Sequence, residues 1–159
     1  MKKYKNYLIS DYLKVLSEKK PTPGGGSVAA LVGATASSLV LMVANYSKGK
    51  TGKKAKESKI KKIILDSEKI RKRLIELIDL DADAYKGVVA ARDKSVSEQK
   101  KAAKKARGIP LEVCKLCYKE LGLVSFLVEE GNKNLMGDIE IAIEMIFASY
   151  NSAIVLTKQ

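Results

Sequence analysis

The stretch LIDLDADAY contains three aspartates, which are the first candidates for chemistry in this sequence. A helical apolar stripe that includes Ile78 continues, in steps of three and four, to Asp81 and Tyr85. Asp79 and Asp83 fall on the other side of the same helix. A carboxyl group on a buried face is costly unless it is paired or lines a wet pocket, where a raised pKa suits it to proton transfer. Asp81 is therefore a candidate acid or base, and an internal cap or ion pair is the alternative.

A glycine-rich turn at residues 21–27, PTPGGGS, leads into a long run without charged residues. If this run is a helix, its free amide groups and its dipole would face an anion beyond the turn. The phosphate-loop pattern is absent, because no Gly-Lys-Ser/Thr stands at the required spacing. The alternative to an anion site is a turn that is needed only for packing. Ala30, Ala34 and Ser38 recur at every fourth position, which predicts a close helix crossing or a subunit interface. Hydroxyl side chains dilute the hydrophobicity of this run, which disfavours a membrane span.

Three further groups are weaker candidates. Asp138 stands near the start of the last predicted helix, where capping is the simpler interpretation. The basic turn at residues 48–54 suits phosphates or carboxylates equally. Cys114 and Cys117 are predicted to be buried structural thiols, because no histidine and no second cysteine pair completes a zinc site. No metal site is therefore expected.

The composition limits the classes of partner and of chemistry. The 159 residues carry 30 Lys and Arg against 18 Asp and Glu, and this net charge of +12 favours an anionic partner, a solvated lysine-rich surface being the alternative. Nucleic acid is disfavoured, because aromatic residues are few and no helix-turn-helix signature is present. Without histidine, acid–base chemistry must rest on carboxylates, lysines, tyrosines, thiols or water. The start has no apolar run long enough for a signal peptide, so a cytoplasmic location is expected.

Helical periodicity over most of the chain predicts an all-α protein, a single domain over residues 1–159 built as a helical bundle with long amphipathic helices. The predicted helices cover residues 10–19, 27–47, 55–93, 110–130 and 135–157. Ser10 and Ser27 are the predicted N-caps, and Pro110 is predicted to stand in a first turn. Residues 95–108 are expected to form an exposed helix or a loop. The last helix is apolar on most sides and is predicted to be central and buried.

The run PTPGGGSVAALVGATASSLVLMVANYSKGK resembles the N-terminal signature of the cyclodeaminase/cyclohydrolase family. This family includes the C-terminal domain of bifunctional formiminotransferase-cyclodeaminase and stand-alone methenyltetrahydrofolate cyclohydrolases. The stretches LIDLDADAY, IPLEVCKLC and EEGNKNLMGDIEIA resemble its succeeding motifs in the same order. The resemblance implies an all-helical fold, homodimers or dimer-based homo-oligomers, and an active site near the dimer interface. It also implies a tetrahydrofolate derivative as substrate and no permanently bound cofactor.

By this resemblance, Asp81 is the expected general acid/base, and Asp138 is expected to polarise a neighbour or to hold the pterin. The expected substrate-binding residues are Pro23, Gly24, Gly25, Gly26, Ser27, Gly49, Lys50, Lys53, Lys54 and Tyr85. The three lysines would meet the glutamate tail of the folate, including a polyglutamylated tail. Cyclohydrolysis is slightly favoured over cyclodeamination, because no formiminotransferase domain accompanies the sequence. The alternatives are a non-catalytic folate-binding relative and a basic helical nucleic-acid-binding protein.

Overall fold

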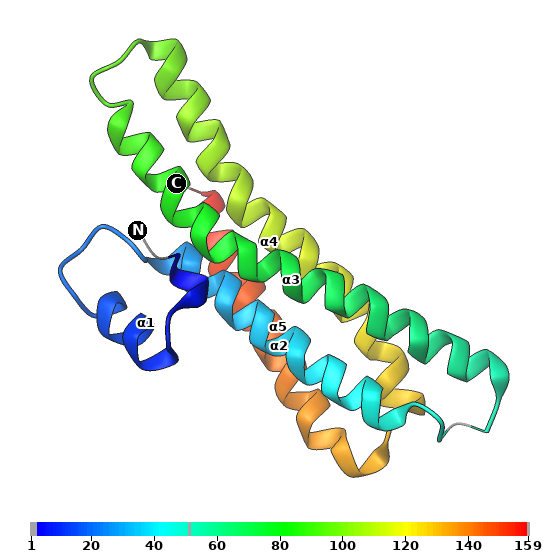
Figure 1. The fold of residues 1–159 in the computed structure, drawn as a ribbon. Helices are drawn as coiled ribbons and strands as arrows, with labels where there is room; N and C mark the ends of the chain where they lie inside the picture. The colour runs from blue at the N-terminus through cyan, green and yellow to red at the C-terminus, as the bar shows by residue number, and fades with distance from the viewer. Residues whose placement is uncertain (1–2, 51, 159) are drawn as a thin grey trace.

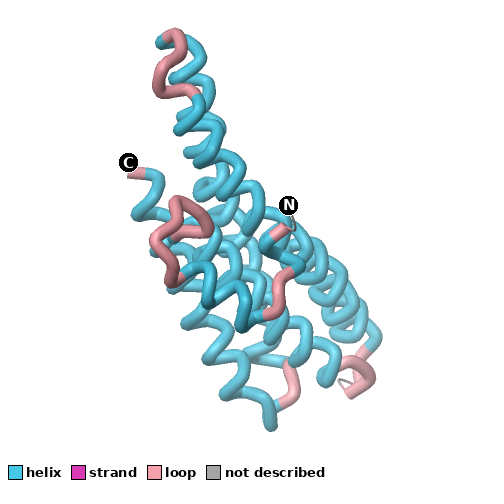
Figure 2. The backbone as a smooth tube through the Cα atoms, turned by 60° about the vertical axis from the view of Figure 1, so that its left-hand side comes forward, coloured by secondary structure: helices cyan, strands magenta, loops and turns pink. Residues whose placement is uncertain are grey.

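The computed structural model describes residues 3–50 and 52–158, and over these residues every regular element is a helix (Figure 1). The elements are η1 (Tyr4–Asn6), α1 (Ile9–Leu16), α2 (Gly25–Ser47), α3 (Lys54–Ala90), α4 (Val96–Glu130), η2 (Lys133–Leu135) and α5 (Met136–Thr157). Helices α2 to α5 form an elongated bundle, and α1 lies at its side (Figures 1 and 2). The predicted all-α fold is confirmed.

The central helix is α2, which packs against α3, α4 and α5. Its small residues let the neighbouring helices approach closely. At Gly33, an added Cβ would lie 2.8 Å from the Ser149 Oγ of α5 and 3.2 Å from the Leu74 Cδ1 of α3. No side chain fits there unless these neighbours move. The small residues of α2 therefore lie where this helix crosses α3 and α5 of the same chain.

The prediction that the last helix is central and buried is wrong. Helix α5 buries one face, and its outer face exposes Ile141, Phe147 and Val155. A helix that is apolar on most sides carries apolar side chains on its outer face as well as on its inner face. Its periodicity alone does not show whether another element covers the outer face. By length and composition, Gly25–Ser47 and Lys133–Thr157 are both apolar enough to cross a membrane, but the first is the core helix of this bundle.

Helix α4 begins well before Pro110, so the predicted helix start there is wrong. Ser95 is the N-cap in a capping box: the Glu98 N–H donates to Ser95 Oγ at 3.4 Å, and the Ser95 N–H donates to the Glu98 carboxylate at 3.2 Å. Between this cap and Pro110 the sequence is rich in lysine and alanine, which are strong helix formers. The buried Pro110 then stands inside a continuous helix.

Two other predicted caps are also wrong. Helix α1 starts with Leu8 at the N-cap position, and α2 starts with Gly24 there, so neither Ser10 nor Ser27 caps a helix. Ser27 lies in the first turn of α2 instead, where its hydroxyl shares a 2.9 Å hydrogen bond with the hydroxyl of Tyr12. Because the Ser27 hydroxyl is bonded to the buried Tyr12 of α1, it does not cap the backbone N–H groups of α2.

The end of α3 and the start of α4 project beyond the other helices as an antiparallel pair (Figures 1 and 2). We call residues 86–107 the projecting hairpin. Its base lies beside the N-terminus of α2, which brings three helices to one place.

Candidate active site

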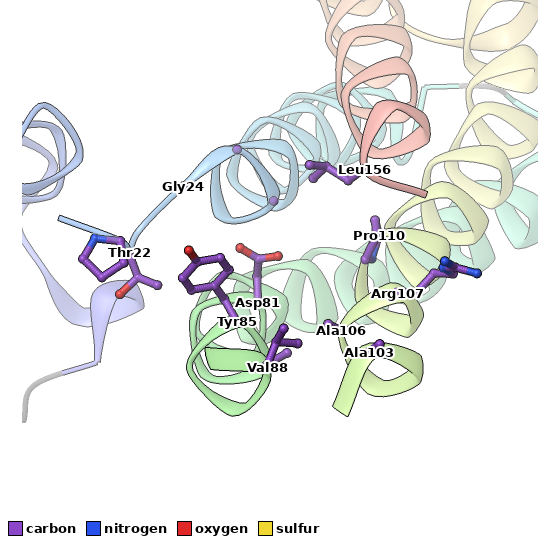
Figure 3. A pocket seen from close by; sticks show the side chains of 14 residues that line it. Thr22, Gly24, Asp81, Tyr85, Val88, Ala103, Ala106, Arg107, Pro110 and Leu156 are labelled. Atoms are coloured by element: carbon purple, nitrogen blue, oxygen red, sulfur yellow. The ribbon is translucent and has the colours of Figure 1, made fainter. Parts of the chain in front are cut away.

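A pocket of about 400 Å³ lies where the N-terminus of α2 meets the end of α3 and the first half of α4 (Figure 3). The glycine-rich turn forms one wall, and Asp81 and Tyr85 of α3 form the floor. Arg107 and Pro110 of α4 lie on the opposite side (Figure 3). The structure therefore brings Gly24, Gly25, Gly26, Asp81 and Tyr85 together around the pocket, whereas Pro23 and Ser27, which were also predicted to bind substrate, do not line it.

The carboxyl group of Asp81 lies against the first turn of α2. A Cβ on Gly26 would be 2.0 Å from Asp81 Oδ1 and 2.4 Å from its Cγ, so any side chain at this position would displace the carboxyl. The Ser27 backbone N–H donates a hydrogen bond to the same carboxyl. Unpaired amides and the positive end of the helix dipole favour an anion here. Asp81 thus caps α2 from a neighbouring helix and still lines the pocket.

Burial raises the pKa of Asp81, and the hydrogen bond from Ser27 partly opposes the rise. The carboxyl group is half-buried, so it is shielded from bulk water on one side and open to the pocket on the other. A raised pKa makes a carboxylate a stronger base, and this favours the uptake of a proton from a bound ligand. This is the electrostatic situation that proton transfer from a bound ligand requires.

Asp79 was predicted to point away from the buried face, and this prediction is wrong. It is buried beneath the N-terminal segment, and the Tyr4 N–H donates to its Oδ1 at 2.7 Å. The Tyr4 hydroxyl in turn donates to the carbonyl oxygen of Thr22 at 3.0 Å. Asp79 therefore anchors the segment that holds the glycine turn in place. Asp83, by contrast, is exposed.

The α4 side of the pocket was not among the residues predicted from the sequence. Ala103, Ala106 and Pro110 line it at intervals of three and four residues, and so does Arg107, four residues after Ala103. These intervals place them on one face of a helix, a pattern that becomes visible once α4 is known to continue through Pro110. Among the described residues, Arg107 is the one cationic side chain that lines the pocket.

The other predicted site residues lie at the opposite end of α2. That helix has 23 residues, a length of about 35 Å, and the basic turn follows its C-terminus. The residues concerned are Gly49, Lys50, Lys53 and Lys54. Asp138, in the first turn of α5, is at the same end, since the nearby Asn132 N–H donates to Ser47 Oγ at 2.8 Å. One chain does not bring these residues to the pocket, because a helix is rigid and holds its two ends apart.

The two cysteines are buried, as predicted. The Cys117 thiol donates to the Ser149 hydroxyl at 3.2 Å, and that hydroxyl donates to the carbonyl oxygen of Ala29 at 2.7 Å. Burial raises the pKa of Cys117 to about 11, so the thiol stays protonated at neutral pH. Within residues 3–50 and 52–158, no three potential metal ligands cluster.

The chain was compared with known proteins and structures. Residues 8–159 match the family model described as formiminotransferase-cyclodeaminase. The methenyltetrahydrofolate cyclohydrolase of Methylorubrum extorquens is 33% identical over 158 residues, which cover 93% of this chain and 76% of that protein. The formimidoyltransferase-cyclodeaminase of Rattus norvegicus is 22% identical, over 92% of this chain and 30% of that protein.

The structural comparison agrees with these relatives. The crystal structure of formiminotetrahydrofolate cyclodeaminase from Thermotoga maritima matches with a TM-score of 0.92 and 31% sequence identity, covering 96% of this chain and 77% of that chain. A match of this extent includes all the helices that form the pocket. The chain therefore belongs to the formiminotransferase-cyclodeaminase family, in agreement with the resemblance of its motifs.

Proposed function

We propose that this protein is an enzyme acting on the one-carbon unit of reduced folate. It hydrolyses methenyltetrahydrofolate to formyltetrahydrofolate, or cyclises formiminotetrahydrofolate with release of ammonia. The relative that is 33% identical over 93% of the chain is named a cyclohydrolase, which favours the first reaction. The observation that carries the proposal is the carboxyl of Asp81, held by the glycine turn inside a 400 Å³ pocket of this fold.

In the hydrolytic reaction, water attacks the methenyl carbon and gives a tetrahedral intermediate. Asp81 accepts a proton from the attacking water. The protonated carboxyl then returns this proton to the ring nitrogen as the bond between that nitrogen and the carbon breaks, and the hydroxyl group on the carbon releases its proton to solvent as it becomes the formyl carbonyl. The raised pKa of Asp81 suits both transfers. In the cyclodeaminase reaction, the same group gives its proton to the departing amino nitrogen.

The walls of the pocket suit a flat ring system that has apolar faces and polar edges. Val88, Ala106, Pro110 and Leu156 present apolar surface, and the glycine turn presents backbone groups. Binding pockets of this kind combine apolar walls with a few polar groups that fix the orientation of the ligand. The pterin would lie against these walls with its one-carbon bridge beside Asp81.

The test is the substitution Asp81→Asn, which keeps the shape of the side chain and an oxygen that can accept the Ser27 hydrogen bond. Loss of methenyltetrahydrofolate is followed by its absorbance, and formation of the same chromophore from formiminotetrahydrofolate tests the other reaction. We expect kcat to fall by roughly 10²–10⁴-fold. Asp83→Asn, an exposed aspartate two residues further along α3, is the matched control and should leave kcat unchanged. Unchanged turnover in Asp81→Asn would refute the acid/base role.

We also propose that the protein is a homodimer. The outer faces of α4 and α5 expose Leu111, Tyr118, Ile141, Phe147 and Val155. An apolar pocket of about 190 Å³ lies between the same two helices. Exposed apolar area of this extent favours association. Light scattering after size exclusion is expected to give twice the 17.4 kDa of one chain, and a monomer at micromolar concentration would refute the proposal.

A further inference from the structure

The N-terminal segment is attached to the bundle by two buried tyrosines. Tyr4 is the buried residue of η1 and Tyr12 is the buried residue of α1, and their side chains are 7% and 5% exposed. The two rings pack edge to face, with centroids 6.5 Å apart. The other residues of α1 are partly buried or exposed, so this short helix adds little to the apolar core. Its position on the bundle therefore depends mainly on Tyr12.

The hydroxyl groups of both tyrosines bind residues that flank the glycine turn. The Tyr4 hydroxyl donates to the carbonyl oxygen of Thr22 at 3.0 Å and lies 3.1 Å from Thr22 Oγ1. The Tyr12 hydroxyl shares its 2.9 Å hydrogen bond with the Ser27 hydroxyl. Thr22 and Ser27 are themselves buried, and they stand on either side of the glycines at residues 24–26. The two tyrosines therefore hold the turn at both of its ends.

The glycines do not hold the turn by themselves. At Gly24 and at Gly25, an added Cβ would meet no atom within 4 Å apart from those of its chain neighbours, so nothing packs against this side of the turn. Glycine also has the greatest backbone freedom of any residue. The position of the turn, and with it that of the Ser27 N–H group, therefore depends on the contacts of the flanking residues.

The N-terminal segment and the glycine turn are both fixed to α3. The Asp79 carboxylate accepts a hydrogen bond from the Tyr4 N–H at 2.7 Å. Asp81, two residues further along the same helix, accepts one from the Ser27 N–H. Because a helix is rigid, the segment that holds the turn is fixed relative to the carboxyl group that the turn contacts.

We propose that Tyr4 and Tyr12 are positioning residues for the reaction at Asp81. Their hydroxyl groups fix the glycine turn, so that the Ser27 N–H stays on the Asp81 carboxyl and orients it in the pocket. Ser27 does not line the pocket, and its side chain has a role here that needs no contact with the substrate. The inference rests on the proposed function, because it assigns the two tyrosines to the same reaction.

The pKa of Asp81 depends on whether the turn is held. Burial raises this pKa, and the Ser27 N–H lowers it. The titratable or charged side chains that face Asp81 are Tyr12 of α1, Tyr85 of α3 and Arg107 of α4. The described residues that α2 and α5 bring to the pocket carry no charge. If the N–H group moves away, the effect of burial remains and the pKa of Asp81 rises. The acidic limb of the kcat profile then moves to higher pH, because less of the carboxyl is ionised at a given pH.

The test is Tyr12→Phe, which removes one hydroxyl and keeps the packing of the ring. We expect kcat to fall roughly tenfold, the effect of losing one hydrogen bond, with KM unchanged, a small loss of Tm and the acidic limb at higher pH. Tyr4→Phe should act in the same direction, because it frees the other end of the turn. Tyr46→Phe changes an exposed tyrosine near the other end of α2 and is the control, which should leave kcat and its pH profile unchanged.

Ser27→Ala breaks the same bond between hydroxyl groups and leaves the backbone N–H of residue 27 in place. The kcat values of Ser27→Ala, Tyr12→Phe and the double variant should be equally reduced, because each variant lacks the same bond. Losses of kcat that add up in the double variant would overturn the inference. A loss of Tm in Tyr12→Phe with kcat unchanged at every pH would also overturn it, since the tyrosine would then affect stability alone.

NMR of isotopically labelled aspartate carboxyl groups separates this inference from the proposed function, because it follows Asp81 without turnover. The Asp81 signal, assigned with Asp81→Asn, should titrate at higher pH in Tyr12→Phe than in the unmodified protein. This result, without turnover of either folate by the unmodified protein, refutes the reaction and leaves the positioning of Asp81 standing. Turnover with the same titration midpoint and the same kcat in Tyr12→Phe refutes the positioning role and leaves the reaction standing. An unchanged midpoint without any turnover refutes both.

Discussion

Replacing Glu120 by glutamine should stabilise this protein above neutral pH. Glu120 lies on α4 in the core, 1% exposed, beside Ser37 of α2 and Ser67 of α3. The two hydroxyls partly offset the effect of burial on its pKa, but neither has the geometry of a hydrogen bond. Both carboxyl oxygens therefore lack a partner within the described residues. A buried carboxylate without a partner is costly, so the carboxyl tends to keep its proton.

Burial raises the pKa of Glu120 from 4.5 to about 7 in the folded protein. Between these two values the folded state binds more protons than the unfolded state, so the free energy of unfolding falls as pH rises. A shift of this size corresponds to about 3 kcal/mol at 1.36 kcal/mol per pKa unit. The loss is complete above the folded pKa of about 7 and absent well below 4.5. Glutamine has no charge to bury and removes this dependence.

The assay is urea or thermal unfolding of both proteins at a series of pH values from 5 to 8.5. Relative to the unmodified protein, Glu120→Gln should gain about 3 kcal/mol over this range, or roughly 6–12 °C in Tm for a domain of this size. Glu129→Gln, an exposed glutamate on the same helix, is the control and should give a difference that does not change with pH. A pH-independent difference for Glu120→Gln would refute the reasoning, since it would mean that the buried carboxyl does not titrate between the folded and unfolded states.

Two glycine substitutions test the close approaches in the bundle. Gly26→Ala should cause a large loss of kcat and a small loss of Tm, because the new Cβ would stand 2.0 Å from Asp81 Oδ1 and move the carboxyl. Turnover assays and Tm measurements on the same variant check this. Unchanged turnover would contradict the described position of Asp81. Gly33→Ala should lower the free energy of unfolding by about 1–3 kcal/mol through crowding of the α2 crossing with α3 and α5, as measured by urea denaturation. Gly122→Ala is the matched control, because Gly122 is exposed on α4 and an added Cβ would meet no other atom. This variant should gain about 0.5–1 kcal/mol in the free energy of unfolding. A similar decrease in the free energy of unfolding in both variants would show that crowding is not the cause.

Local patterns in the sequence were enough to predict the helices that have clear apolar stripes. Helix α2 was predicted over residues 27–47 and covers Gly25–Ser47, and α3 was predicted over residues 55–93 and covers Lys54–Ala90. The sequence left open whether the first half of α4 is a helix or a loop, because this segment has no apolar stripe with helical spacing. Its helix depends on residue propensity and on the capping box at Ser95, which are weaker signals than burial.

The candidate site was only partly accessible to the same reasoning. Asp81 was found because helical spacing places it in line with buried residues, and that spacing is a property of the local sequence. Arg107 was missed, because its relation to Asp81 depends on how α4 packs against α3. Glu120 was also missed, since its burial requires neighbours from α2 and α3.

By itself, the sequence determined the helical fold and the family and made Asp81 the candidate for chemistry, because each follows from short-range spacing or from motifs in order. Only the tertiary structure decided which groups share a pocket. It joined the glycine turn to Asp81 through the close approach at Gly26, and it placed Arg107 on the opposite wall. It also separated Asp138 and the basic turn from them by the length of α2. These relations depend on helix packing and helix length, which act between residues far apart in the chain and leave no local pattern in the sequence.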